Sequence, residues 1–236
     1  MAAAGEAVRG LVTGPTQLAR LLHAGPHASY YEATQSRAFA LLGPHAVRVP
    51  IGVLLDAPGS EPCPPSPASV QIGDGAVCVD GNRHPILRWW ATRVPDHDQL
   101  ELSTDLCERN FDLITSERLG RGEGLTPEGD DELAGMLVAL HAYGDRAAAA
   151  RLASAVLTRL DAHPNATTAV SAALLRAACD GHAVPQLARF LAEGCATGTA
   201  AHRDLLAVGH TSGAALARGA LQIHAHHTHL KEAALV

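Results

Sequence analysis

The sequence predicts an α+β fold in which a small antiparallel β-rich N-terminal unit is followed by a mostly α-helical bundle. Residues 1–94 contain short β-branched and apolar runs with a hairpin-type turn, which are typical of strands. Residues 95–236 instead repeat apolar side chains at helical spacing. A chain of 236 residues that is 47% hydrophobic can bury a core, and its composition excludes disorder as the main state.

The first element expected along the chain is a short helix over residues 10–24. Thr13-Gly14-Pro15 marks its beginning, and Gly25-Pro26 marks its end. Its apolar face would consist of Leu18, Leu21 and Leu22.

Strands are expected between about residues 30 and 90. VRVPIGVLLD is β-branched and apolar, and SVQIGDGAVCVDG predicts two short strands around an Asp74-Gly75 turn. The proline-rich stretch APGSEPCPPSPA between them is expected to be an exposed loop within the unit.

Helices dominate the rest of the chain. The apolar spacing and the capping signals predict them over residues 98–118, 129–143, 145–161, 167–180, 185–193, 199–207 and 213–230.

Composition excludes several classes of function. The formal net charge of −6 disfavours binding to nucleic acid or to an anionic membrane. Five widely spaced cysteines without a C-x-x-C pair argue against a disulfide framework or a thiolate zinc site and suit reduced thiols in the cytoplasm. No signal-peptide pattern and no apolar run of the ~18 residues needed to span a bilayer are present. Lys231 is the single lysine, so Schiff-base chemistry and a Walker-type phosphate lysine are not expected.

The stretch GRGEGLTPEGDDELAGMLVALHAYG, residues 120–144, predicts a glycine-rich loop that leads into a buried helix. Thr126 is expected as the N-cap and Pro127 as the first helical residue. Asp130 and Asp131 fall in the first turn, where the helix dipole stabilises carboxylate anions. They form either a site for magnesium, an amide N–H or an ammonium group, or a simple acidic helix start.

A second loop-to-helix motif lies in LLAVGHTSGAALARGALQI, residues 205–223. Its serine is one position late for the G-x-S-x-G nucleophile elbow, so a serine hydrolase is not expected. The hydroxyl and amide groups of the loop suit an anion or a carboxylate, although helix capping alone would need the same residues. His210 is a candidate general acid or base, and Arg218 is expected to be a surface arginine.

Two further polar clusters have structural explanations. Thr168 and Ser171 lie at the start of the helix expected over residues 167–180, where capping is the default role. Near the C-terminus, histidines at one-turn spacing suit a transition metal, but without acidic partners they fit a frayed, solvated tail better. These are His224, His226, His227 and His229.

Three blocks, GLTPEGDDELAG, TTAVSAALLRAACDG and VGHTSGAALARGAL, in this order resemble the AllH family over about residues 95–223. Some members of that family are assigned as a subunit of oxamate carbamoyltransferase, which works with companion subunits in allantoin and purine breakdown. The resemblance implies carbamoyl transfer between oxamate and phosphate. The matching positions are Gly124, Leu125, Thr126, Pro127, Gly129, Asp130, Asp131, Thr168, Ser171, Gly209, His210, Ser212 and Gly213. Departures from the family pattern add charge beside the expected pocket and leave the substrate open; they are Arg121, Glu123, Glu128 and Glu132.

The leading hypothesis is an enzyme or enzyme subunit of the carbamoyltransferase type that handles a small carbamoyl, amide or carboxylate metabolite. Catalytic roles are expected for Asp130, Asp131 and His210. Substrate binding is expected from Gly124, Thr126, Gly129, Thr168, Ser171, Gly209, Thr211, Ser212 and Gly213. No motif identifies a cofactor, and magnesium is kept as a candidate.

The expected partners are a small-molecule substrate and either companion subunits or further copies of the chain, with no nucleic acid and no membrane. Two alternatives stay open: a standalone lyase, cyclase or hydrolase in another, for example biosynthetic, pathway, and a non-catalytic binding or assembly subunit.

Overall fold

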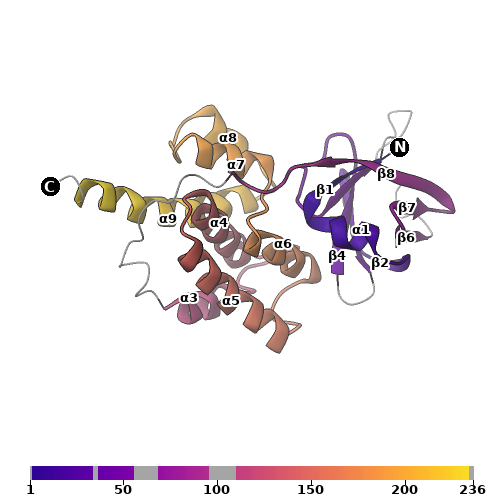
Figure 1. The fold of residues 1–236 in the computed structure, drawn as a ribbon, viewed down its shortest axis with the longest axis horizontal. Coiled ribbons are helices and arrows are strands. Elements are labelled where there is room, and N and C mark those ends of the chain that lie inside the picture. The colour runs from indigo at the N-terminus through magenta and orange to yellow at the C-terminus, as the bar shows by residue number, and fades with distance from the viewer. Residues whose placement is uncertain (1, 34–36, 56–68, 96–109, 234–236) are drawn as a thin grey trace. The chain divides into compact units, whose positions relative to one another are not determined.

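The structure, a computed structural model, describes residues 2–33, 37–55, 69–95 and 110–233, with side chains up to residue 227 (Figure 1). The chain forms two compact units, Met1–Thr92 and Arg93–Val236. The first unit is built of strands and the second of helices (Figure 1). The proline-rich loop expected at residues 57–68 lies outside the described residues.

The first unit is a closed barrel with the strand order β1-β5-β4-β3-β2-β6-β7-β8. Its strands are β1 (Ala2–Gly5), β2 (Gln17–Ala24), β3 (Ala28–Ala33), β4 (Arg37–Leu42), β5 (Gly52–Leu55), β6 (Val70–Gly73), β7 (Ala76–Val79) and β8 (Asn82–Trp90). The burial of β3 alternates residue by residue, as expected for a strand with one face toward a core. The largest side chains fully buried in this unit are Tyr31, Phe39, Leu41 and Ile72.

The predicted fold class is wrong for this unit. Two of the barrel's pairings are parallel, β1 with β8 and β4 with β5, so the sheet is mixed rather than antiparallel. It is also closed, which removes the free edges that a small open sheet would expose. The local part of the prediction holds at the hairpin, because β6 and β7 flank Asp74 and Gly75, both with positive φ as a type I′ turn requires.

The helix predicted over residues 10–24 is also wrong. A 3-10 turn, η1 (Glu6–Val8), and a short helix, α1 (Arg9–Thr13), end at Gly14, and β2 follows. Pro15 has no amide hydrogen to continue a helix, and β2 pairs with both β3 and β6. Leu18 is 64% exposed and Leu21 37% exposed, so the expected apolar helix face does not exist.

The second unit consists of helices whose bounds lie close to those predicted. They are α3 (Phe111–Arg118), α4 (Glu128–Ala142), α5 (Arg146–Ala162), α6 (Ala169–Cys179), α7 (Pro185–Ala192), α8 (Ala200–Leu206) and α9 (Ser212–Ala233). Most of the helix predicted over residues 98–118 lies outside the described residues, and the described part begins at Phe111. Within the described part of the chain, no helix has both the length and the apolar character needed to cross a membrane.

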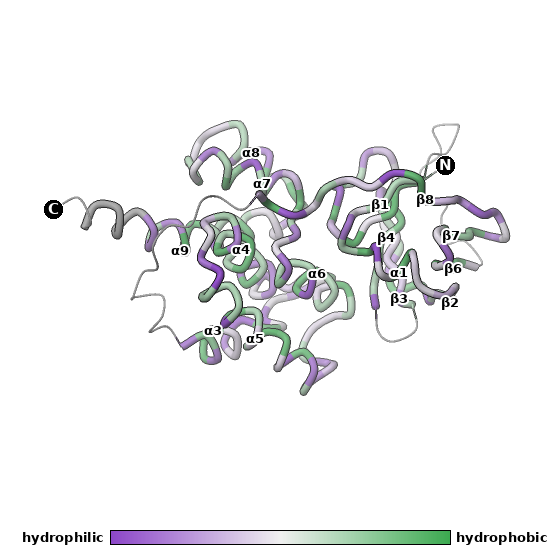
Figure 2. Tube along the Cα trace, in the orientation of Figure 1, coloured by the Kyte–Doolittle hydropathy of each residue, from purple (hydrophilic) through white to green (hydrophobic). Residues whose placement is uncertain are grey.

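Helix α4 is buried along almost its whole length, as its apolar composition predicts (Figure 2). It packs closely against α9 through two glycines. A Cβ atom at Gly135 would lie 2.2 Å from the Leu216 carbonyl oxygen, and one at Gly219 would lie 2.0 Å from the Glu132 carbonyl oxygen. No side chain larger than hydrogen fits either position, so these glycines set how closely the two helices approach.

Candidate functional site

The loop between α3 and α4 is held against the helices by backbone contacts that only glycine allows. Gly120 has a φ of +73°, and a Cβ atom there would lie 1.9 Å from the Ala166 carbonyl oxygen. A Cβ atom at Gly129 would lie 2.1 Å from the Arg118 carbonyl oxygen. The glycines expected to bind substrate therefore include one, Gly129, that has a clear packing role.

Asp130 is 1% exposed and joins three segments of the helical unit. Its Oδ1 accepts a hydrogen bond from the Gly120 backbone N–H at 2.7 Å, and its Oδ2 accepts one from the Ser171 hydroxyl at 2.6 Å. The Thr167 hydroxyl donates a further, short hydrogen bond to Oδ2. Both carboxylate oxygens are thus occupied by protein donors.

Thr168 connects the same loop to α6. Its hydroxyl caps the helix by accepting from the Ser171 N–H at 3.0 Å and donates to the Leu125 carbonyl oxygen at 2.6 Å. The capping role expected for this cluster is confirmed. In addition, the cluster fixes the loop that precedes α4, which the sequence did not indicate.

Asp131 lies in a different environment from its neighbour. Its side chain is 7% exposed, and Oδ2 is buried with no hydrogen-bond partner among the described residues. Burial raises the pKa of the carboxyl from 3.8 to about 7, with smaller contributions in the same direction from the charges of Asp130 and Glu128. The nearby hydroxyls of Ser212 and Thr126 partly oppose this rise in the pKa. Asp131 can therefore gain or lose a proton near neutral pH.

The two predicted loop-to-helix motifs meet at the hydroxyls of Thr126 and Ser212, whose oxygens are 2.9 Å apart. The prediction that Thr126 caps α4 is wrong: Pro127 occupies the N-cap position without a side-chain hydrogen bond. Ser212 is the first residue of α9, and Gly209, with a φ of +62°, turns the preceding loop toward it. Gly213 packs so closely that a Cβ atom would lie 1.9 Å from the Leu205 carbonyl oxygen.

Other predicted site residues lie at the surface of these loops. His210 and Gly124 are exposed, and a Cβ atom at Gly124 would meet nothing within 4 Å. Thr211 is half-buried, and its carbonyl oxygen accepts the Ala215 N–H at 3.0 Å. No hydrogen bond or ion pair in the described part of the chain joins His210 to the Asp131 carboxyl.

Sequence reasoning missed an ion-pair network beside Asp131. Arg218, expected as an ordinary surface residue, donates to Glu132 at 2.8 Å and to Glu128 at 2.9 Å. Arg118 donates to the other carboxylate oxygen of Glu132 at 3.3 Å. The available signal was the i,i+4 spacing of Glu128 and Glu132, which places two acids on one face of α4.

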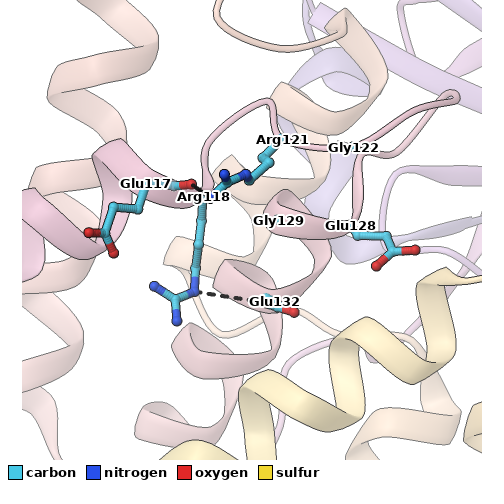
Figure 3. A pocket seen from close by; sticks show the side chains of 7 residues that line it. All are labelled: Glu117, Arg118, Arg121, Gly122, Glu128, Gly129 and Glu132. Atoms are coloured by element: carbon cyan, nitrogen blue, oxygen red, sulfur yellow. Dashed lines mark hydrogen bonds and ion pairs between the residues drawn. The ribbon is translucent and has the colours of Figure 1, made fainter.

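Arg118, Glu128 and Glu132 of this network also line a pocket of about 370 Å³ (Figure 3). Arg118 and Arg121 come from the end of α3 and the loop after it, while the two acids come from the first turns of α4 (Figure 3). The lining residues are Glu117, Arg118, Arg121, Gly122, Glu128, Gly129 and Glu132.

The expectation of a frayed tail is wrong for the first part of the C-terminal histidine segment. The His224 Nδ1 lies 2.6 Å from the Tyr143 hydroxyl, and the His227 ring is buried with its centroid 4.6 Å from that of Tyr143. Across the residues that the structure describes, no group of three or more His, Cys, Asp or Glu side chains is placed to hold a metal ion.

No solved structure matches the chain. The family described as oxamate carbamoyltransferase subunit AllH matches residues 118–223, which include Asp131, Thr126, Ser212 and every residue of the pocket except Glu117. The resemblance predicted from the three sequence blocks is therefore confirmed, and residues 118–223 are similar to the AllH family.

Proposed function

We propose that this chain is a subunit of an enzyme that transfers carbamoyl groups, and that Asp131 moves the proton in that reaction. The observation that carries the proposal is the Asp131 carboxyl itself. One of its oxygens is buried without a partner, its pKa is raised to about 7, and it lies beside the Thr126 and Ser212 hydroxyls. Perturbed buried carboxyls of this kind are typical of functional sites. The match to a carbamoyltransferase subunit family supplies the reaction class.

Carbamoyl transfer to oxamate needs a proton acceptor. The oxamate nitrogen attacks the carbamoyl carbon of carbamoyl phosphate, a C–N bond forms, and the C–O bond to phosphate breaks. The attacking nitrogen loses a proton to the Asp131 carboxylate, and in the reverse direction the protonated carboxyl returns it. A pKa close to the working pH lets one group serve both directions.

The neighbouring groups take supporting roles in this proposal. The Thr126 and Ser212 hydroxyls, which lie at the meeting point of the two loops, donate to substrate oxygens on which negative charge develops. His210 is exposed in the second loop, two residues before Ser212, and is assigned no separate step. Asp130 is a positioning residue, because its carboxylate oxygens already accept three protein hydrogen bonds. Companion subunits or a further copy of the chain complete the enzyme.

The test is turnover of carbamoyl phosphate and oxamate by the chain together with its companion subunits. Asp131→Asn keeps the shape of the side chain but cannot transfer the proton, so kcat is expected to fall about 100-fold or more. The matched control is Asp161→Asn, whose side chain is 66% exposed and pairs with Arg176 on another helix. Turnover by Asp131→Asn equal to that of Asp161→Asn would remove Asp131 from the mechanism.

A further inference from the structure

We infer that the pocket between the end of α3 and the first turns of α4 binds a small zwitterion, a molecule with an oxyanion at one end and a cationic nitrogen at the other. The pocket is distinct from the Asp131 carboxyl, which does not line it. The inference is independent of the proposed reaction, because it rests on the charges of the pocket walls and not on the chemistry at Asp131.

The pocket lining carries both arginines and acids, with the arginines at the α3 end and two of the acids on α4. Figure 3 shows Arg118 and Arg121 at the end of α3 and in the loop after it, and Glu128 and Glu132 on α4; Arg118 reaches Glu132 directly, and Glu128 lies apart from both arginines. A ligand with a single charge would meet attraction from one set of side chains and repulsion from the other. A zwitterion can satisfy both sets at once, and electrostatic matching of this kind selects ligands by the arrangement of their charges.

The guanidinium groups of Arg118 and Arg121 have N–H donors that make no hydrogen bond among the described residues. In the described part of the chain, the Arg121 guanidinium makes only a long hydrogen bond of 3.4 Å to the Glu117 carbonyl oxygen. Arg118 uses Nε alone, in its bond to Glu132, so its terminal nitrogens have no hydrogen bond among the described residues. Guanidinium groups bind carboxylate and phosphate oxygens through paired N–H donors, so these arginines suit an oxyanion.

Some carboxylate oxygens of the pocket are bonded to arginines, and others are free to accept hydrogen bonds from a ligand. Both carboxylate oxygens of Glu132 are bonded to arginines, and Glu128 is bonded to Arg218 through Oε2. The Oε1 atom of Glu128 has no hydrogen bond among the described residues. The carboxylate of Glu117, which lies on α3 beside the arginines, has none there either. The ion pairs hold the bonded carboxylates in place, while these remaining oxygens can accept N–H groups from a ligand.

Two glycines, Gly122 and Gly129, also line the pocket. Gly122 has a φ of +119°, and a Cβ atom there would lie 2.7 Å from the Glu128 backbone nitrogen. Gly129 likewise has no room for a side chain. Both glycines line the pocket without a side chain, and the volume of about 370 Å³ is at the small end of the range of ~300–1,000 Å³ for ligand sites.

The experiment is calorimetric titration of the full chain with a matched set of small molecules. 5-Aminopentanoate is the zwitterion, and pentanoate and pentylamine carry the same chain with one charge each. The zwitterion is expected to bind about tenfold or more tightly than either, because hydrogen bonds to both the arginines and the acids contribute. A fourth probe, 4-aminobutylphosphonate, distinguishes a phosphate-like oxyanion from a carboxylate, and tighter binding of either zwitterion supports the inference.

Two variants locate the binding. Arg121→Met is expected to reduce zwitterion affinity about tenfold, to the level of pentylamine, whereas Arg159→Met, which removes an exposed arginine on α5, leaves it unchanged. Glu117→Gln removes an acceptor without breaking an ion pair of the described residues and is expected to weaken the zwitterion but not pentanoate. Equal affinities for the zwitterions and the singly charged probes, or wild-type affinity in Arg121→Met, would overturn the inference.

Discussion

Replacing Asp131 by asparagine is expected to change how the stability of the helical unit depends on pH. Below the ordinary carboxyl pKa of 3.8, Asp131 is protonated in both the folded and the unfolded chain. As the pH rises, the unfolded chain loses this proton first, while burial keeps the folded carboxyl protonated up to about pH 7. The wild type therefore loses folding free energy as the pH rises through this window.

The size of the loss follows from the two pKa values. Each unit of pKa difference between the folded and unfolded states corresponds to about 1.4 kcal/mol. The difference between 3.8 and about 7 thus gives a total loss of about 4 kcal/mol, of which about 2.5 kcal/mol falls between pH 5 and pH 8. Asparagine has no proton to lose, so Asp131→Asn avoids this loss and gains on the wild type as the pH rises.

Denaturant unfolding at several pH values measures this directly. Both tryptophans, Trp89 and Trp90, lie in the barrel unit, while far-UV circular dichroism reports mainly on the helices. The pH dependence of the helix unfolding curve should differ between Asp131→Asn and the wild type. The pH dependence of the tryptophan unfolding curve, which reports on the barrel, should be the same in both proteins. Asp161→Asn controls for the loss of an exposed carboxylate. Parallel stability curves for Asp131→Asn and the wild type from pH 5 to pH 8 would refute the reasoning.

Three further predictions concern the packing around the site. Gly219→Ala places a Cβ atom 2.0 Å from a carbonyl oxygen of α4, and it is expected to lower the free energy of unfolding by about 1–3 kcal/mol in thermal unfolding. The control is Gly10→Ala, whose Cβ atom has its nearest neighbour at 3.6 Å and should raise the free energy of unfolding by about 0.4–1 kcal/mol. Equal effects of the two substitutions would contradict the close contact between α4 and α9. Asp130→Ala removes the acceptor of three hydrogen bonds and should cost about 3 kcal/mol in denaturant unfolding, and a cost below about 0.5 kcal/mol would argue against its positioning role. Arg218→Met leaves the negative charge of Glu128 uncompensated, so the Asp131 midpoint should move to higher pH in the stability profile, and an unchanged midpoint would show that the two are not coupled.

The helices could be predicted from the sequence because their signals are local. The Asp145 side chain caps α5 by accepting the Ala148 N–H at 3.0 Å, and the Thr168 hydroxyl does the same for α6. Residues within four positions decide such ends. The predicted helix over residues 145–161 accordingly differs by one residue at each end from α5 (Arg146–Ala162).

The closure of the barrel could not be predicted because the pairings that close it join strands that are not neighbours along the chain. The pairing of β1 with β8 and that of β4 with β5 leave no local mark in the sequence. The leucines of β2 illustrate the error: Leu18, Leu21 and Leu22 have helical spacing, yet hydrogen bonds to strands on both sides make this segment extended. Tertiary pairing overrides local pattern in such cases.

The sequence predicted which residues belong to the candidate site, but not the environment of each side chain. Asp130 and Asp131 are adjacent and equivalent in the sequence, but successive helical residues point about 100° apart, so one carboxyl meets three donors and the other is buried beside two hydroxyls. Likewise, the Thr126 and Ser212 hydroxyls meet only because α4 and α9 pack closely at their glycines. No pattern within either motif indicates that contact.

The position of β1 in the barrel has a consequence for how the chain folds. This strand, Ala2–Gly5, lies between β5 and β8, so its partners come much later in the chain. Pairings between distant residues slow folding because a long loop must close before any contact forms. We therefore expect β1 to pair with β5 and β8 late in folding, although it comes first in the sequence. Closure of the barrel should be slower than formation of the helices. Trp89 pairs with Ala4 at this seam, so its fluorescence would follow the closure step during refolding.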